Sequence, residues 1–426
     1  MNERGAILIT GATGFLGSEI AARLLCRDDR PLLCLVRADS AAAAARSGHA
    51  ALAGALGRPP TAAEASRVRW LDADLETFDL GMPAPVRRFL ARTIEEIFHC
   101  AEPSALDLPL EAARRINLVP VRLIHALAAE AAALGRFRQL HYVSTAYAAG
   151  RTRGRIGAEC LPPDTSRRFR NTYERVKAEA ERFLRRCSSV STTIYRPSII
   201  VGDSRTGRAA GWRALYPQMM LAAAGRLPVV PRRGAARVDC VPVDYVADAI
   251  VALGARADSA GATFHLTAGT ATLSVSDVIR HTYAGIARQR GGPLRLGTRT
   301  VGPIRWWLME RAHRLRARGP ARETFDGLRA YVPYTQISSV FDNTREAGLL
   351  AGSGVCLPHP RDFFPRVVDY ALAHDFGRRP AAPACSAGAV ESPARGATTS
   401  EDGGTPRAQF VAAMTCRARE ESSWLL

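Results

Sequence analysis

Short apolar runs alternate with helix-length segments along the first half of the chain. The first run, residues 6–10, is followed by a glycine-rich turn and a helical pattern up to Leu25, and a second run ends at Val36. Together these pieces form a strand-helix-strand unit of about 30 residues, the size of a dinucleotide-binding unit. The alternation predicts an α/β fold, namely a Rossmann-type doubly wound parallel sheet with helices on both faces. The strands are predicted at residues 6–10, 31–36, 68–71, 96–100, 139–144 and 192–195.

The pattern changes after Gly202 to short pieces punctuated by glycine and proline. Two helical stretches stand out there, at residues 245–255 and 276–289. We assign residues 202–375 to a smaller, substrate-covering C-terminal domain. This domain is partly interleaved with the Rossmann domain, which we place at residues 1–250.

The start of the chain and its cysteines indicate its cellular location, and the composition of its end indicates disorder. The run at residues 6–10 follows a start too short for a signal peptide, and charged residues interrupt every stretch near the ~20 apolar residues that a membrane span needs. Nine cysteines without a Cys-x-x-Cys pair, among them Cys34 and Cys240 in apolar runs, are typical of reduced core positions. We therefore expect a cytoplasmic protein without a transmembrane span. Residues 379–426, rich in small and polar residues, are predicted to form a disordered tail.

One segment near the end of the smaller domain carries exposed-looking aromatic residues. Residues 301–320 contain Trp306, Trp307, Leu308 and Met309 among many arginines. This composition is typical either of a lid helix over a substrate or of a helix in peripheral contact with a membrane surface. The apolar face is short, which favours the lid.

A net charge of +18 raises the question of a nucleic-acid partner. The basic residues are dispersed and form no aromatic-interleaved groove or DNA-binding motif, so we expect no nucleic acid to bind. Of the 58 basic residues, 57 are arginine and one, Lys177, is lysine. Because the chain uses arginine everywhere else, we infer that a guanidinium does not serve at position 177.

A glycine-rich turn joins the first predicted strand to the first predicted helix. Its glycines let the backbone turn sharply and approach a pyrophosphate at the helix N-terminus. The spacing G-x-x-G-x-x-G, in place of G-x-G-x-x-G, indicates the short-chain dehydrogenase branch of Rossmann proteins. The residues of this turn that we expect to contact the cofactor are Gly11, Thr13, Gly14, Phe15, Leu16 and Gly17.

The residues after the second and third strands bear on the type of nucleotide. Arg37 stands where an NAD-binding protein usually places an acid for the ribose hydroxyls, so it favours a 2'-phosphate and hence NADPH. In the alternative, Asp39 binds the ribose and Arg37 is a solvated charge, although Asp39 and Ser40 also suit the start of the next helix. Asp74 and Leu75 are placed to contact the adenine, or else Asp74 is an ordinary turn residue.

Tyr173 and Lys177 lie four residues apart in a strongly helical stretch, so their side chains share one face. The spacing alone is common, but here the only lysine of the chain occupies it. An ammonium binds ribose hydroxyls and lowers the pKa of the phenol from about 10, which makes tyrosine a usable proton donor near neutral pH. We therefore predict both residues to be catalytic, and Lys177 also to contact the cofactor. The motifs require no metal ion.

Hydroxyl and amide side chains around this pair complete the predicted site. Ser144 and Thr145 end the fifth strand, where a hydroxyl can donate to a substrate carbonyl oxygen. We expect this role for Thr145 first, because Ser144 can instead fix the backbone. Asn117, in the helix after the fourth strand, either holds a water linked to Lys177 or is an ordinary polar residue. Pro197 ends a strand that runs into a loop beside the nicotinamide.

These motifs together resemble the extended short-chain dehydrogenases, and within them the thioester reductase and fatty acyl-coenzyme A reductase group. The likeness is specific over residues 6–250 and continues more weakly to Tyr370, so that only the tail lies outside it. The motifs are Leu-Ile-Thr-Gly-Ala-Thr-Gly-Phe-Leu-Gly, Cys-Leu-Val-Arg-Ala, Ile-Phe-His-Cys-Ala, Val-Ser-Thr-Ala-Tyr, Tyr-x-x-x-Lys, Arg-Pro-Ser-Ile-Ile-Val-Gly and the late Phe-Asp-Asn-Thr-Arg-Glu-Ala-Gly.

The resemblance implies that NADPH delivers a hydride to an acyl thioester carried by coenzyme A or by an acyl carrier protein. Thr145 and Tyr173 would hydrogen-bond the developing oxyanion, and Lys177 would orient the ribose. The product would be an aldehyde, and a second hydride would give the alcohol. Two places depart from the family pattern. Glu102 and a proline stand where small or apolar residues usually line the nicotinamide pocket, and Leu-Val-Pro-Val follows Asn117 where a glycine is common.

Two other functions fit the same scaffold. A sugar-nucleotide epimerase or dehydratase, or a hydroxysteroid-type dehydrogenase, would use the same catalytic residues. Arg37 and the arginine-rich segment at residues 301–320 favour a thioester, whose pantetheine arm is phosphorylated. A nucleotide-bound protein without catalytic activity would be expected to lack Tyr173 or Lys177, and both are present.

Overall fold

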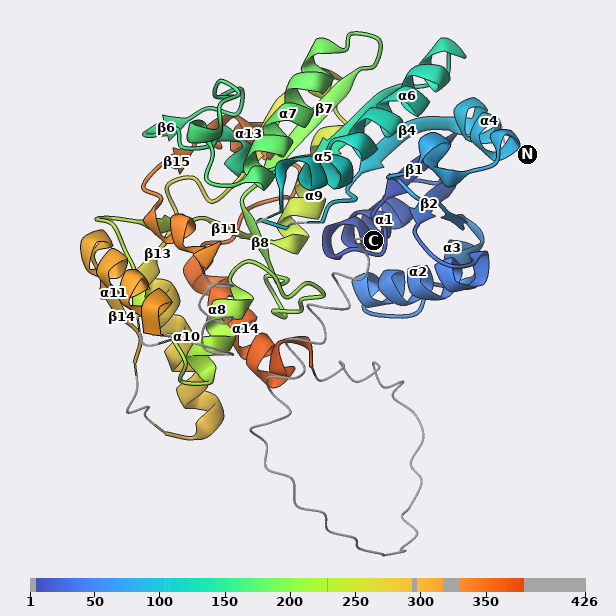
Figure 1. Ribbon diagram of the computed structural model, residues 1–426. Helices are drawn as coiled ribbons and strands as arrows, with labels where there is room; N and C mark the ends of the chain where they lie inside the picture. Colours follow the sequence, from blue (N-terminus) through green and yellow to red (C-terminus); the bar gives the residue numbers. More distant parts are fainter. Residues whose placement is uncertain are drawn as a thin grey trace, which may run out of the picture.

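A sheet of seven parallel strands forms the centre of the computed structural model, which describes residues 5–103, 105–106, 108–227, 229–292, 297–316 and 329–378 (Figure 1). The strand order is β3-β2-β1-β4-β5-β7-β12. This arrangement confirms the predicted doubly wound α/β fold. The predicted tail at residues 379–426 lies outside the described residues. The strands are β1 (Ala6–Thr10), β2 (Leu32–Val36), β3 (Val68–Asp72), β4 (Ile94–His99), β5 (Gln139–Val143), β7 (Thr192–Pro197) and β12 (Thr263–Leu266).

Helices cover both faces of the sheet because side chains alternate along each strand. In β1, Ile7 and Ile9 pack into one apolar cluster, whereas Ala6 and Leu8 pack into the other. The first cluster is covered by α1 (Phe15–Arg27), α2 (Ala41–Leu56) and α9 (Val243–Gly254). The second is covered by α4 (Ala84–Thr93), α5 (Leu110–Asn117), α6 (Val119–Ala133) and α7 (Thr172–Arg186), and the short α3 (Ala62–Ser66) precedes β3.

Strand β12 is the one strand of the sheet that the apolar pattern does not predict. It adds to the edge of the sheet by pairing in parallel with β7. All four of its residues are buried, including Thr263 and His265. The backbone N–H of His265 is 2.7 Å from a carboxylate oxygen of Glu346, and its Nδ1 is 2.9 Å from the carbonyl oxygen of Asp342. These tertiary hydrogen bonds satisfy polar groups that would otherwise be costly to bury. The same polar residues give the segment the sequence pattern of a loop.

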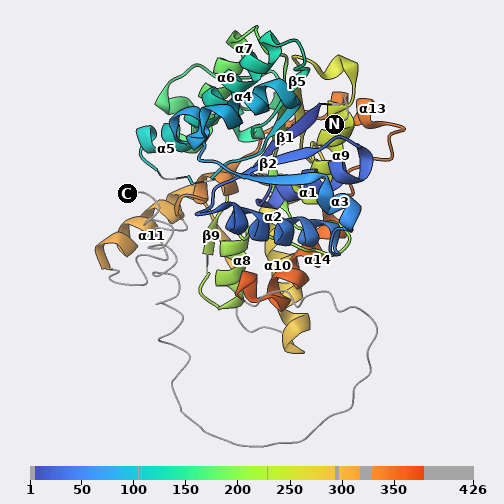
Figure 2. The same cartoon turned by 90° about the vertical axis from the view of Figure 1, so that its right-hand side faces the viewer.

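A smaller region lies below the sheet in both views (Figures 1 and 2). Its helices pack around an apolar cluster that includes Phe363, Phe364, Tyr216 and Ile286. They are α8 (Tyr216–Ala223), α10 (Val275–Arg290) and α14 (Pro360–Ala373), with α11 (Pro303–Arg316) at the margin and α13 (Thr344–Leu350) near the sheet. The strand pairs are β8 (Ile199–Val201) with β11 (Cys240–Pro242), β9 (Val229–Pro231) with β14 (Arg299–Val301), β10 (Arg237–Val238) with β13 (Leu273–Ser274), and β6 (Arg155–Ile156) with β15 (Val340–Phe341).

Two expectations from the sequence can be compared with this fold. Within the described residues, one stretch is long and apolar enough to cross a membrane, Leu110–Ala133, and 56% of its apolar window is buried inside the protein. It comprises α5 and α6, which pack on the sheet as core helices do.

The seven described cysteines are free; Cys34 and Cys240 are buried as expected, whereas Cys26 and Cys356 are exposed. The expectation of core cysteines is therefore wrong for these last two.

Candidate active site

The glycine-rich turn between β1 and α1 has a shape that glycine permits and other residues do not. Gly11 has a φ of +71°, and a Cβ on it would lie 2.7 Å from the backbone nitrogen of Ala101. A Cβ on Gly17 would overlap the carbonyl oxygen of Gly11. The N-cap of α1 is Gly14, which has no side chain that could cap the helix. The first backbone N–H groups of α1 therefore donate no hydrogen bond to a capping side chain. This helix end therefore suits the pyrophosphate of a dinucleotide.

A cavity of about 770 Å³ lies beside this turn, at the carboxyl ends of the parallel strands. The turn residues Thr13, Phe15 and Leu16 line its nucleotide end, and Thr145 and Tyr173 line its middle. The far end lies against the smaller region and is mostly apolar. Its lining includes Leu215, Met219, Leu227, Val229, Val278, Ile279 and Trp306. A single cavity therefore joins a nucleotide end to an apolar end.

Helix α7 brings Tyr173 to the wall of this cavity and places Lys177 one turn further along, buried behind the wall. The helix begins after Asn171, whose side chain accepts a hydrogen bond from the backbone N–H of Glu174 at 3.0 Å. Lys177 is buried, and its Nζ donates to the carbonyl oxygen of Val143 at 2.9 Å and to Glu102 Oε2 at 2.7 Å. The only lysine of the chain is thus fully enclosed at the end of β5.

The electrostatics of this pair differ from the prediction. The pKa of Tyr173 lies well above its ordinary value, because burial disfavours the phenolate and the negative charge of Glu102 adds to that effect. Burial by itself would lower the pKa of Lys177, but Glu102 and Tyr142 outweigh burial and raise it. The predicted lowering of the phenol pKa by Lys177 is therefore wrong for this site as it stands, because the ammonium is already paired with a carboxylate.

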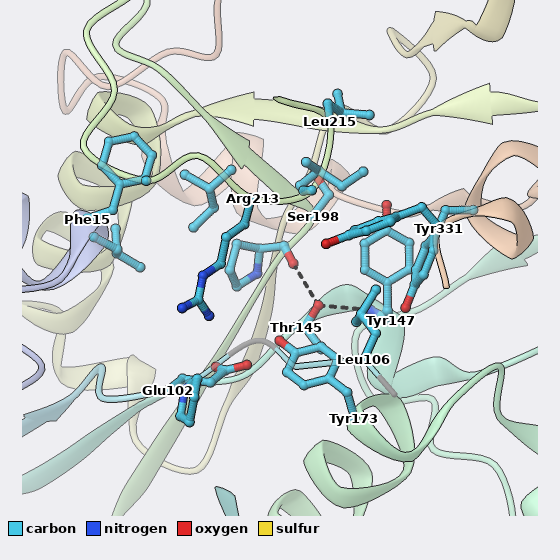
Figure 3. A pocket seen from close by; sticks show the side chains of 18 of the residues that line it. Phe15, Glu102, Leu106, Thr145, Tyr147, Tyr173, Ser198, Arg213, Leu215 and Tyr331 are labelled. Carbon is cyan, nitrogen blue, oxygen red and sulfur yellow. Dashed lines mark hydrogen bonds between the residues drawn. The ribbon is translucent and has the colours of Figure 1, made fainter. Parts of the chain in front are cut away.

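The two hydroxyls at the end of β5 have different partners. Ser144 Oγ donates to Glu181 Oε1 at 2.5 Å, so this hydroxyl is committed to a buried carboxylate. Thr145 Oγ1 makes only long contacts, 3.4 Å to the carbonyl oxygen of Pro197 and 3.3 Å from the backbone nitrogen of Tyr147. Figure 3 shows the Thr145 and Tyr173 hydroxyls directed toward the same part of the cavity. Thr145 is therefore the hydroxyl better able to turn to a substrate, and its contact with a substrate oxygen stays a prediction.

Two further residues predicted for the site are Pro197, which lines the cavity, and Asn117, which does not. Pro197 lines the cavity at the end of β7 and accepts the hydrogen bond from Thr145. Asn117 is buried behind the cavity wall, where its Nδ2 lies 3.5 Å from the carbonyl oxygen of Pro103 and its Oδ1 has no partner among the described residues. A water held by Asn117 stays a prediction, while its contact with Pro103 supports the loop after β4.

The nucleotide end contains the residues predicted to choose the cofactor. Arg37 lines the cavity with its side chain 60% exposed, and its Nη1 is 3.3 Å from a carboxylate oxygen of Glu76. Asp39 is exposed and Ser40 caps α2 through its hydroxyl. Asp74 also lines the cavity, beside Leu75, but its carboxylate accepts hydrogen bonds within the turn that follows β3. The turn role of Asp74 is therefore observed, and its contact with adenine stays a prediction.

Three charged residues of the cavity lining have no role predicted from the sequence: Glu76, Glu102 and Arg213. Glu102 was noted only as a departure from a family pattern, and its contact with Lys177 spans 75 positions of the chain. Arg213 extends into the cavity above Glu102 from the loop before α8 (Figure 3). No motif surrounds Arg213 in its glycine-rich and aromatic loop, so the sequence carries no signal for it.

Helix α11 covers residues 303–316 of the segment 301–320 that was predicted to act as a lid, and residues 317–320 lie outside the described residues. Trp306 is buried and lines the apolar end of the cavity, whereas Ile304, Trp307 and Leu308 are exposed. One side of the helix thus closes the cavity wall and the other faces outward. Both the lid and the membrane-surface interpretations stay predictions.

Comparison with known proteins gives the family of this chain. Residues 9–250 match the family model described as male sterility protein, an NAD-binding family. Among curated relatives, a linear gramicidin synthase of Brevibacillus parabrevis is 30% identical over 63% of this chain and 5% of its own length. Isonitrile lipopeptide synthase of Streptomyces coeruleorubidus is 31% identical over 61% of this chain and 17% of its own. The chain thus matches only a small part of these much longer relatives.

Solved structures agree with this assignment. The terminal R domain of the myxalamid PKS-NRPS pathway superposes with a TM-score of 0.73 at 26% identity, covering 89% of this chain and 94% of that domain. The reductase domain of a nonribosomal peptide synthetase from Mycobacterium tuberculosis shares the fold, with a TM-score of 0.62 at 20% identity over 88% of this chain and 92% of its own. The chain therefore belongs to the NAD-binding male sterility and thioester reductase family, within the extended short-chain dehydrogenases.

Proposed function

We propose that this chain reduces an acyl thioester to an aldehyde, with NADPH as the hydride donor and a carrier protein as the bearer of the acyl group. The observation that carries the proposal is the single cavity that joins the glycine turn to the hydroxyls of Thr145 and Tyr173 and continues into an apolar end. An apolar end suits an acyl chain better than a sugar nucleotide, whose many polar groups would be left without partners. Several relatives are named for nonribosomal peptide synthesis or for aldehyde reduction.

The residues of the cavity support each step of this reaction. When bound, NADPH supplies the hydride that adds to the thioester carbonyl carbon. Thr145 and Tyr173 would donate hydrogen bonds to the carbonyl oxygen, where negative charge develops, and Tyr173 would then transfer its proton to that oxygen. The resulting hemithioacetal releases the thiol and leaves the aldehyde. The long contacts of Thr145 in the structure let its hydroxyl turn to the substrate at little cost.

The test offers the purified full chain one acyl group on three thiols: a carrier protein, coenzyme A and free pantetheine. We expect NADPH consumption matched by aldehyde formation, fastest with the carrier-bound acyl group. Activity with the coenzyme A thioester alone would support thioester reduction but contradict the proposal that a carrier protein bears the acyl group. If the protein binds NADPH but oxidises it with none of the three thioesters, the proposed function is wrong.

The preference for NADPH over NADH is expected to depend on Arg37. Changing Arg37 to alanine removes a guanidinium from the nucleotide end, and a hydrogen bond to a charged group contributes about 1.5–3 kcal/mol. We therefore expect kcat/KM for NADPH to fall by roughly 10- to 100-fold, with kcat/KM for NADH nearly unchanged. The matched control is Arg58→Ala, a surface arginine paired with Glu64. An equal loss with both cofactors would contradict the role of Arg37, and a specific loss with NADH in Asp39→Asn would favour Asp39.

A further inference from the structure

Glu102 places a carboxylate inside the candidate active site. Its Oε2 accepts a hydrogen bond from Lys177 Nζ at 2.7 Å, while its Oε1 is buried without a hydrogen-bond partner in the described chain. The side chain of Glu102 is 14% exposed and that of Lys177 is 2% exposed. Figure 3 shows the hydroxyl of Tyr173 between the Glu102 carboxylate and Thr145. The pair is thus a buried ion pair next to the proposed proton donor.

The loop that carries Glu102 is held against the sheet and α5. Backbone N–H groups at its start bond to β1, from Cys100 to the carbonyl oxygen of Thr10 and from Ala101 to the Thr10 hydroxyl, both at 3.2 Å. Further on, Asn117 in α5 approaches the carbonyl oxygen of Pro103. The position of the carboxylate is therefore set by contacts on both sides of it along the chain.

Most titratable groups around the ion pair are neutral. Burial lowers the pKa of His99 to about 3, so its imidazole is uncharged at neutral pH. Burial also raises the pKa of Tyr142 and of Cys100 to about 12, so the phenol and the thiol stay protonated. The ring of Tyr142 lies 4.5 Å below Lys177 Nζ and adds a favourable cation-π contact.

Charged groups elsewhere near the pair are Arg213, on the exposed side of the cavity, and the ion pair between Glu181 and Arg196 behind Ser144. The Glu181–Arg196 pair is fully buried, and its charges largely cancel each other because three hydrogen bonds join the two side chains. Arg213 is solvated, so its field at Tyr173 is screened. Burial and the Glu102 carboxylate are therefore the largest causes of the high pKa of the Tyr173 phenol, and the phenols of Tyr334 and Tyr142, whose own pKa values are raised, add to them.

Two opposite charges side by side act very differently on a phenol from one charge alone. A lone ammonium would stabilise the phenolate, whereas a carboxylate next to that ammonium largely cancels the effect. The buried phenol then keeps its proton well into the alkaline range. A reductase needs this protonated form, because the phenol gives its proton to the substrate oxygen.

Resting on the function proposed above, we propose that Glu102 is a positioning residue of the reductase: by pairing with Lys177 it keeps Tyr173 in the protonated, proton-donating form over a wide pH range. Glu102 acts through Lys177 and Tyr173 and not by touching the reacting atoms.

The test compares Glu102→Gln with the wild type by titration of the phenol, read as the difference absorbance of tyrosinate. Removing the negative charge leaves Lys177 unopposed, so we expect the pKa of Tyr173 to fall. One tyrosine of the variant should titrate at least one pH unit lower than in the wild type, equivalent to a tenfold change in its ionisation constant. This step should be absent from Glu102→Gln combined with Tyr173→Phe, and Glu102→Asp should restore the wild-type titration at least in part.

The same variants are assayed for reduction across pH. In Glu102→Gln, the pH at which kcat/KM falls on the alkaline side should be lower by the same amount as the tyrosine titration. The value of kcat/KM near neutral pH should change less than its value at alkaline pH. Glu111→Gln, which removes an 82% exposed carboxylate on α5, is the matched control and should shift neither readout. An unshifted tyrosine titration in folded Glu102→Gln would overturn the role of Glu102. Because that titration needs no substrate, failure of the proposed function would appear separately, as a wild type that oxidises no NADPH.

Discussion

Replacing Tyr173 with phenylalanine should lower kcat for thioester reduction by about 10²- to 10⁴-fold, the usual contribution of a positioned general acid. The ring still fills the wall of the cavity, so the substitution removes one hydroxyl and little else. Cofactor affinity should stay within a few fold, because the glycine turn and Lys177 are unchanged. The measurements are kcat from NADPH consumption and the NADPH dissociation constant from fluorescence titration.

The matched control for this change is Tyr370→Phe. Tyr370 lies outside the cavity lining and stacks its ring on Trp212 and His374, contacts that phenylalanine keeps. We expect the control to retain wild-type kcat. A Tyr173→Phe enzyme with near wild-type kcat would mean that another group, with Thr145 first in line, supplies the proton. A loss of NADPH binding in the same variant would instead assign Tyr173 to the cofactor site.

The parallel sheet could be predicted from the sequence because its central strands β1 and β2 are buried on both faces and therefore appear as nearly continuous apolar runs. Strand β1 is the plainest case, with every residue from Ala6 to Thr10 buried. Strand β12 could not be predicted in this way, because its burial depends on hydrogen bonds from His265 to Glu346 and to the Asp342 carbonyl. These acceptors lie about 80 residues further along the chain. Apolar periodicity holds no information about such distant polar partners.

Local spacing was also enough to bring several site residues together. Tyr173 and Lys177 share a face because they lie four apart on α7, and the glycine turn follows from close backbone contacts. The lone lysine among arginines proved a useful signal, since Lys177 is enclosed at the centre of the site. The charge state of that site could not be predicted in the same way. It depends on Glu102, which a loop from a different strand brings to Lys177.

A second large effect is expected in the free energy of unfolding, from the buried ion pair beneath the active site. Glu181 lies four residues after Lys177 on α7, and its carboxylate accepts hydrogen bonds from Arg196 Nε at 2.9 Å and Nη2 at 2.6 Å and from the Ser144 hydroxyl. Both charged side chains are completely buried. Glu181→Gln keeps the shape but leaves the Arg196 guanidinium without a negative partner, which costs about 3–5 kcal/mol in buried pairs.

We therefore expect Glu181→Gln to lower the free energy of unfolding by roughly that amount, about 3–5 kcal/mol, as measured by urea denaturation. The control Asp258→Asn breaks an exposed pair with Arg256 and should change the unfolding midpoint little. Adding Arg196→Met to Glu181→Gln should recover part of the loss, because the penalty comes from the unpaired charge and the double variant buries none. If the double variant is as unstable as the sum of its single changes, then packing and the Ser144 hydrogen bond, not the unpaired charge, account for the loss. In that case the pair would serve mainly to fix Ser144, and through the backbone to hold Thr145 in place beside Tyr173.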